Sequence, residues 1–129
     1  MIIPVRGDPS PLACLLDSVA SQPEVQLIVT ASGDRDARWA ALEARRSDVV
    51  WIWGGPGRGP QQNRGAGVAT GRWLWFVHAD SRVPPRFVDA FGRLDADPRA
   101  TWGAFRFALA SGDWQARLWE RGVALRVRL

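Results

Sequence analysis

Short apolar runs of strand length recur along this chain, and segments with helical features lie between them. This alternation limits the possible folds, because repeated strand–helix units with short loops favour a mainly parallel sheet flanked by helices. The chain is therefore expected to adopt an α/β fold. The runs expected to form strands are Ile2–Val5, Val25–Thr30, Val49–Trp53 and Trp73–Val77.

The segments between these runs carry signals for helix starts and ends. Ser10 followed by Pro11 is typical of an N-cap and a first-turn proline. The apolar residues that follow recur at helical spacing, which places them on one face. That face comprises Leu12, Leu15, Leu16 and Val19. Further helices are expected after Asp34 or Asp36, from near Pro60 through Ala69, and from Pro84-Pro85 to Pro98.

The C-terminal part of the chain gives a mixed pattern. Trp102–Leu109 alternates apolar and polar residues, which predicts a strand. From Asp113 onward the pattern favours a helix, although Val123–Leu129 also alternates as a strand does. In the helix before these segments, the residues expected to face inward are Phe87, Val88, Phe91 and Leu94.

Length and composition are those of one globular domain spanning residues 1–129. Of the 129 residues, 47% are hydrophobic, which is enough for a single sizeable core. No apolar run approaches the roughly 18 residues that cross a bilayer, and no secretory leader is expected. We therefore expect a cytoplasmic protein without a transmembrane segment. The single cysteine, Cys14, lies among leucines and is expected to be buried.

The charge pattern does not favour a polyanion as partner. The formal net charge is +4, from 17 basic and 13 acidic residues. A basic balance is compatible with nucleic-acid binding, which usually relies on a dense basic patch or stripe. Here the basic residues are scattered among the acids, so nucleic acid is not an expected partner.

Ligands of parallel α/β sheets bind beyond the carboxyl ends of the strands, so the loops there are the candidate sites. The loop after Trp53 is dense in glycine and proline, and Arg58 within it is suited to a phosphate. The helix that follows would offer unpaired amides to an anion. The loop is neither a Walker A loop nor a dinucleotide fingerprint, since glutamine stands at position 62. A flexible connection is the alternative.

The loop after Val77 is the second candidate, because Asp80 directly follows a buried apolar run. A carboxylate there can hold a divalent cation that bridges diphosphate oxygens, and His78 could point the same way. Local packing of His78 and a turn-capping role of Asp80 are the alternative. Asp8 and Ser32-Gly-Asp34 also follow strands, where loop capping is the ordinary role. One cysteine and one histidine leave no zinc spacing, and no Ser-His-Asp triad stands out.

Taken together, these segments resemble the family-2 glycosyltransferases of the GT-A fold. Their order, spacing and strand context agree over essentially the whole chain. The matching segments are Ile2–Val5 for the opening strand, Gly57–Gly65 for the Arg/Asn/Gly segment, Ala69–Gly71 for a helix end, and Trp73–Asp80 for the strand leading into the DxD-type metal motif. The His78-Ala79-Asp80 form, with Trp102-Gly-Ala-Phe105 downstream, is similar to a bacterial subgroup associated with arsenosugar biosynthesis.

The resemblance implies a GT-A, Rossmann-like fold and a glycosyltransferase that moves a sugar from a nucleotide-diphosphate donor to an unknown acceptor. It further implies that Mn²⁺ or Mg²⁺, held by Asp80 and His78, stabilises the departing nucleoside diphosphate. The nucleotide-sugar-binding residues that it implies are Pro4, Arg6, Asp8, Thr30, Arg58, Asn63 and Ala79.

Three departures from the family pattern bear on these expectations. Thr30 stands where the family usually has an acid that contacts the base, and Asp8 replaces a glutamate. The later acidic segment that supplies the family's general base lies beyond Leu129, so the chain resembles a truncated, nucleotide-sugar-binding half. The catalytic base is therefore unknown. Asp113 and Glu120 are the only late acids, and a solvated or salt-bridged role, for Glu120 with Arg117 or Arg121, is the ordinary one.

Two other functions remain open at this point. A degenerate GT-A module without a catalytic base would act as a nucleotide-binding or assembly piece, and could self-associate through an exposed C-terminal surface of Trp114, Leu118 and Leu125. A nucleotidyltransferase would place a glycine-rich loop with arginine after the first strand, and Arg6-Gly-Asp-Pro9 matches that pattern poorly.

Overall fold

The computed structural model describes residues 1–20, 22–106 and 108–128. The chain divides into two compact units, Met1–Phe91 and Gly92–Leu129. The expectation of one domain over residues 1–129 stays a prediction, because this division does not decide whether either unit folds alone.

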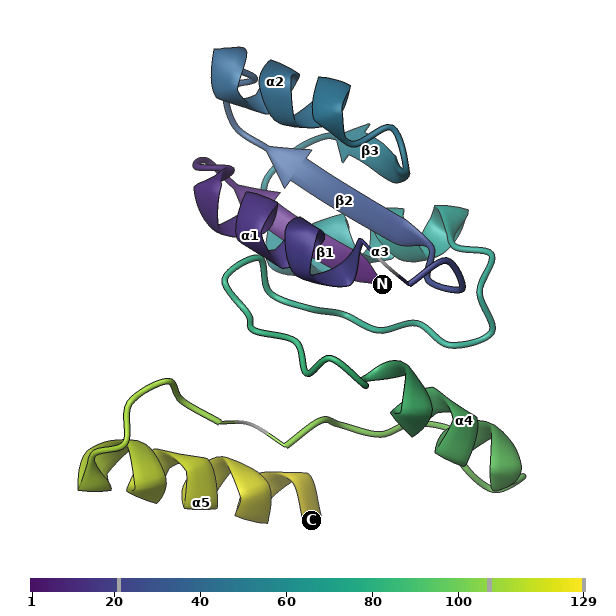
Figure 1. Cartoon of the computed structure of the whole chain (residues 1–129), viewed down its shortest axis with the longest axis vertical. Helices are drawn as coiled ribbons and strands as arrows, with labels where there is room; N and C mark the ends of the chain where they lie inside the picture. Colours follow the sequence, from purple (N-terminus) through teal and green to yellow (C-terminus); the bar gives the residue numbers. More distant parts are fainter. Residues whose placement is uncertain (21, 107, 129) are drawn as a thin grey trace. The chain divides into compact units, whose positions relative to one another are not determined.

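The first unit contains a three-stranded parallel sheet in the order β1-β2-β3, with helices packed against it (Figure 1). This arrangement confirms the expected α/β class. In register, Ile2 of β1 lies opposite Ile28 of β2. The strands are β1 Ile2–Arg6, β2 Leu27–Ser32 and β3 Val49–Trp53, and the helices between and after them are α1 Ser10–Val19, α2 Ala37–Arg45 and α3 Arg58–Val68.

The two faces of the sheet are covered by different helices. Odd-numbered strand residues such as Ile3 and Val29 form one hydrophobic core with the apolar faces of α1 and α2. Even-numbered residues face α3, where a Cβ added at Gly65 would lie 2.5 Å from Cγ2 of Ile2 and 3.3 Å from Cγ2 of Thr30. Because side chains alternate along a strand, this division follows directly from the register.

Helix α1 buries the expected face of Leu12, Leu15, Leu16 and Val19. Two predictions about it are wrong. Its N-cap is Pro9 and not Ser10, which is the first helical residue. Cys14 is exposed, because residues 12, 15, 16 and 19 occupy the inward face and position 14 falls outside it. A run of leucines around a cysteine therefore did not decide on which side of the helix the thiol lies.

Helices α2 and α3 begin at defined caps. Asp36, one of the two predicted candidates, caps α2 by accepting hydrogen bonds from the backbone N–H groups of Arg38 and Trp39. Helix α3 begins at Arg58, slightly earlier than expected, after Gly57, whose φ of 114° is the left-handed region that favours glycine. It ends at Val68 with Ala69 as C-cap, close to the predicted end.

The fourth predicted strand, Trp73–Val77, is reduced to a single parallel bridge between Ile2 and Phe76. The backbone N–H of Ile2 donates to the carbonyl of Trp75 at 2.7 Å, and that of Val77 donates to the carbonyl of Ile2 at 3.0 Å. The next donor on this edge of β1 would be residue 4, which is proline and has no N–H. The ladder therefore loses its next donor just past Val77, at the end of the predicted run.

The chain after this bridge packs by aromatic contacts before the next helix, α4 Val88–Ala96. Phe87 is buried, and its ring centroid lies 4.9 Å from that of Trp75, while Phe91 lies 5.7 Å from the same ring. The helix begins a few residues after Pro84-Pro85 and ends before Pro98, in broad agreement with the prediction.

The second unit contains the helix α5 Trp114–Arg128, so the helical prediction for the tail is correct. The strand predicted at Trp102–Leu109 is not formed: residues 101–106 and 108–109 have no regular structure, and Phe107 lies outside the described residues. No described strand pairs with this segment, and a strand without a partner is not stable by itself. In the described part of the chain, no helix is both long and apolar enough to cross a membrane.

Candidate functional site

The order of the strands in the sheet places the candidate site at the carboxyl ends of the strands, beside β1. From β1 the chain moves outward to β2 and β3, and then returns past β1 to the bridge at Phe76 on the opposite side. Ligands of open α/β sheets bind at such a reversal point, beyond the carboxyl ends of the strands. The loop after β1, which contains Asp8, and the loop after the bridge, which contains Asp80, flank this point.

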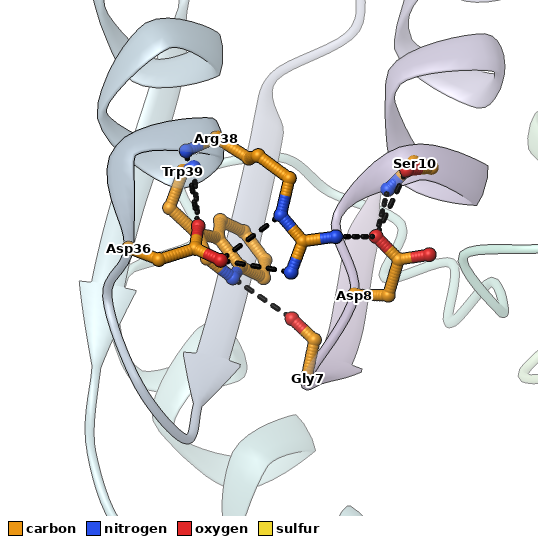
Figure 2. Close-up of polar contacts among 6 residues, drawn as sticks. All are labelled: Gly7, Asp8, Ser10, Asp36, Arg38 and Trp39. Carbon is orange, nitrogen blue, oxygen red and sulfur yellow. Dashed lines mark hydrogen bonds and ion pairs between the residues drawn. The ribbon is translucent and has the colours of Figure 1, made fainter.

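Loops after β1 and β2 are joined by backbone contacts. The N–H of Gly7 donates to the carbonyl of Ser32 at 3.2 Å. The indole Nε1 of the buried Trp39 donates to the carbonyl of Gly7 at 2.8 Å (Figure 2). Both Gly7 and Gly33 have positive φ, and a Cβ at Gly33 would lie 3.5 Å from the Gly7 nitrogen. The two turns are thus fixed side by side.

Arg38 adds a charged bridge between the same loops, as Figure 2 shows. Its Nε and Nη2 donate to Oδ2 of Asp36 at 2.9 Å and 2.8 Å, and its Nη1 donates to Oδ1 of Asp8 at 3.2 Å. Hydrogen bonds from the side chain and backbone of Ser10, with the Arg38 guanidinium nearby, lower the pKa of Asp8. The Arg38 side chain likewise lowers the pKa of Asp36, so both carboxylates stay charged.

The loop after β2 is also tied to the end of β3. The Arg35 guanidinium lies 5.7 Å from the centroid of a Trp53 ring and forms an ion pair with Glu43. Glu43 in turn accepts a hydrogen bond from Nε1 of Trp53 at 2.7 Å. Trp53 is the last residue of β3, so this cluster fixes the point where the glycine-rich loop begins.

Helix α3 is anchored to the sheet by Gln61, which is buried. Its Nε2 donates to the carbonyl of Val5 at 2.7 Å and to that of Thr30 at 2.6 Å. These carbonyls belong to adjacent strands near their carboxyl ends. One amide therefore sets the position of the first turns of α3, where Arg58 stands, relative to both strands.

The glycine-rich loop itself is held by Arg64. Its Nη2 donates to the carbonyl of Gly55 at 2.7 Å. A Cβ at Gly54 would lie 2.9 Å from the guanidinium carbon of Arg64, so the side chain of Arg64 packs closely against the start of the loop. Arg64 therefore ties the loop between β3 and α3 to the helix that follows it.

Most residues predicted to bind the nucleotide sugar lie at the surface of the first unit. Four are exposed, two are half-buried and one, Thr30, is fully buried. The Thr30 side chain faces α3, and its Oγ1, like the Oγ of Ser32, has no hydrogen-bond partner in the described part of the chain. The exposed residues are Arg6, Asp8, Arg58 and Asn63, and the half-buried ones are Pro4 and Ala79.

His78 and Asp80 are both exposed in the turn that follows the bridge, where the N–H of Ser81 donates to the carbonyl of His78 at 3.1 Å. Among the described residues, no group of three or more His, Cys, Asp or Glu side chains could hold a metal ion. An exposed carboxylate and an imidazole suit a divalent cation whose remaining ligands come from a diphosphate and water. The donor set thus fits a substrate-bridging ion and does not form a closed metal site.

The two late acids have local contacts in the second unit. Hydrogen bonds from the Ser111 hydroxyl and the Ala116 backbone lower the pKa of Asp113, which caps the start of α5. Glu120 accepts a hydrogen bond from the N–H of Leu109 at 2.8 Å. Within the described residues it forms no ion pair with Arg117 or Arg121, which corrects the pairing considered from the sequence.

Three residues that hold the loops and α3 in place at the carboxyl ends of the strands were not predicted from the sequence. They are Arg38, Gln61 and Arg64. Gln61 offered one signal, because a polar residue four positions before Gly65 shares the inward face of α3 with it. Arg38 gave no such signal, since its partner Asp8 lies 30 residues away and only the fold brings them together.

The chain is thus a doubly wound α/β protein with ordered polar loops at one edge of its sheet. Residues 1–123 match the model of the family described as Glycosyl transferase family 2. Because the match covers most of the chain, the protein belongs to this family. No curated protein and no solved structure matches the chain.

Proposed function

We propose that the chain binds a nucleotide-sugar donor beyond the carboxyl ends of β1 and of the segment that pairs with it at Phe76. The chain would do so as part of a glycosyltransferase that uses Mn²⁺ or Mg²⁺. The strongest support is the reversal of the strand order at β1. It places the Asp8 loop and the Asp80 loop at the same end of the sheet, where the strands end. Membership of the glycosyltransferase family supplies the reaction class.

In this proposal Asp80, with His78, holds the divalent ion beside the donor diphosphate. When bound, the ion would stabilise the charge of the departing nucleoside diphosphate. Arg58, exposed at the start of α3, supplies a second positive charge, and the first amides of α3 favour an anion. Asp8 and Arg6 border the nucleoside. Thr30 is not included, because its side chain is buried beneath α3.

The His78-Ala79-Asp80 segment, together with Trp102-Gly-Ala-Phe105, supports the finer proposal that the chain belongs to the bacterial subgroup associated with arsenosugar biosynthesis. The acceptor, the catalytic base, the cytoplasmic location and the absence of nucleic-acid binding stay predictions. Self-association stays one as well, although Trp114, Leu118 and Leu125 are all exposed.

Thermal stability in the presence of UDP, GDP or TDP, with and without Mn²⁺, tests the donor site. A ligand at about 100 times its Kd stabilises the folded state by about 2.7 kcal/mol, which raises Tm by several degrees. We expect a metal-dependent shift for one nucleotide, and we expect Asp80→Ala to abolish its metal dependence. Glu24→Gln, an exposed acid before β2 at the other end of the sheet, is the matched control.

Two outcomes would count against this function. A folded wild-type protein that shows no shift with any nucleotide would favour the degenerate module, acting as an assembly piece. An unchanged metal-dependent shift in Asp80→Ala would show that the ion binds elsewhere.

A further inference from the structure

We propose that Arg38 is a positioning residue that fixes Asp8 as a charged hydrogen-bond acceptor for the nucleoside part of the donor. The inference rests on the proposed function, because it concerns the same nucleotide site. It adds a residue from α2, a helix that the family resemblance did not connect with the donor.

The Arg38 guanidinium is itself held in place from α2. Oδ1 of Asp36 caps the helix, while Oδ2 of the same carboxylate accepts from both Nε and Nη2 of Arg38. Two donors on adjacent guanidinium nitrogens converge on this one oxygen, which restricts the orientation of the guanidinium. The remaining nitrogen, Nη1, therefore points to Asp8 from a defined direction (Figure 2).

The two oxygens of Asp8 differ in what they contact. Oδ1 accepts from the Ser10 backbone at 3.1 Å, from the Ser10 hydroxyl at 2.8 Å and from Arg38. Oδ2 accepts no hydrogen bond from the residues that the structure describes, and 56% of the side chain is exposed. Three donors on Oδ1 thus orient the carboxylate and leave Oδ2 open to a ligand.

An open carboxylate oxygen selects ligand groups that donate a hydrogen bond. In a nucleotide these are the ribose hydroxyls and the N–H groups of the base. An acceptor that is already ordered loses less conformational entropy on binding than a mobile side chain does. Arg38 would thus raise the affinity for the nucleotide without touching it. An ordinary surface ion pair would affect only stability, and only slightly.

A double-mutant cycle on nucleotide affinity tests this role. The Kd of UDP or GDP, whichever binds the wild type more tightly, is measured calorimetrically with Mn²⁺ for the wild type, Asp8→Asn, Arg38→Met and the double variant. We expect each single variant to weaken binding about tenfold. In the Asp8→Asn background, Arg38→Met should weaken it less than twofold, because the acceptor it positions is already lost. Arg38→Lys should restore part of the affinity.

The matched control is Arg45→Met, which removes another exposed arginine of α2, paired with Asp17 at 3.5 Å. It should leave the Kd unchanged. Analogues of the same nucleotide identify the group that Asp8 accepts from. If the ribose hydroxyl is the donor, Arg38→Met should not change the Kd of a 2′-deoxy analogue. If the base is the donor, Arg38→Met should not change the Kd of an analogue whose base is N-methylated.

The outcomes separate this inference from the function on which it rests. If the wild type binds no nucleotide, the donor site is wrong and the role of Arg38 falls with it. If the wild type binds, and Arg38→Met leaves the Kd unchanged or adds its full effect to that of Asp8→Asn, the positioning role alone is overturned.

Discussion

The indole Nε1 of Trp39 donates to the carbonyl oxygen of Gly7 at 2.8 Å, across 32 residues of sequence (Figure 2). The contact joins the first turn of α2 to the loop after β1. Trp39 is also packed edge-on against Trp51 and Trp53, with ring centroids 6.4 Å and 5.0 Å away. One buried side chain therefore links the hydrophobic core to the backbone of the candidate donor site.

Trp39→Phe should destabilise the protein by about 2 kcal/mol, because it removes this hydrogen bond and part of the volume of a buried ring. Urea unfolding measures the change. Trp119→Phe is the control, since Trp119 is 70% exposed and its replacement should change stability by less than about 0.5 kcal/mol. Equal effects of the two substitutions would contradict the structural role given to Trp39.

Gly65→Ala should destabilise the protein by about 1–3 kcal/mol, because the new methyl group would overlap Ile2 of β1. Gly67 lies in the same helix and has open space around its Cβ position. Gly67→Ala should therefore be neutral or stabilise the helix by up to about 1 kcal/mol. Thermal unfolding should show a lower Tm for Gly65→Ala and an unchanged or higher Tm for Gly67→Ala; an equal loss of Tm in both variants would contradict the described packing of α3.

Gln61→Leu should cost about 2 kcal/mol, because it removes both hydrogen bonds to the carbonyls of Val5 and Thr30 in a buried position. Gln62→Leu makes the same chemical change one residue later, at a half-buried side chain. It should have little effect on urea unfolding. A comparable loss in both variants would mean that the amide of Gln61 does not anchor α3.

Acid should weaken the ion pair between Arg46 and Asp48, whose two contacts are both 2.8 Å. The Arg46 guanidinium lowers the pKa of Asp48 below its unfolded value of about 4. The contribution of the pair is therefore present above about pH 4 and is lost as the pH falls through the folded-state pKa.

Asp48→Asn should accordingly lower Tm at pH 6 and narrow its difference from the wild type at pH 3. The effect should stay below about 1 kcal/mol, because the Asp48 side chain is half exposed and solvent screens the pair. Tm measured across this pH range checks the sign. A difference that is constant with pH would show that the ion pair does not contribute.

Local patterns in the sequence were sufficient for most of the first unit. The three strands and the inward face of α1 depend on neighbouring residues and on the periods of helices and strands, and the sequence narrowed the cap of α2 to Asp34 or Asp36. The Trp73–Val77 run looked equally strand-like. Only Phe76 of this run pairs with β1, and Pro4, far away in sequence, lacks the N–H that would extend the pairing past Val77.

The alternation of apolar runs was enough to specify a parallel α/β sheet with polar loops at one edge, because each run and each helix is a local feature. The arrangement of that edge was decided only by the folded chain. Asp8 and Arg38, like Gln61 and the carbonyls of Val5 and Thr30, are far apart in sequence. Their contacts depend on the order and register of strands, which bring distant residues to one edge and which no local pattern encodes.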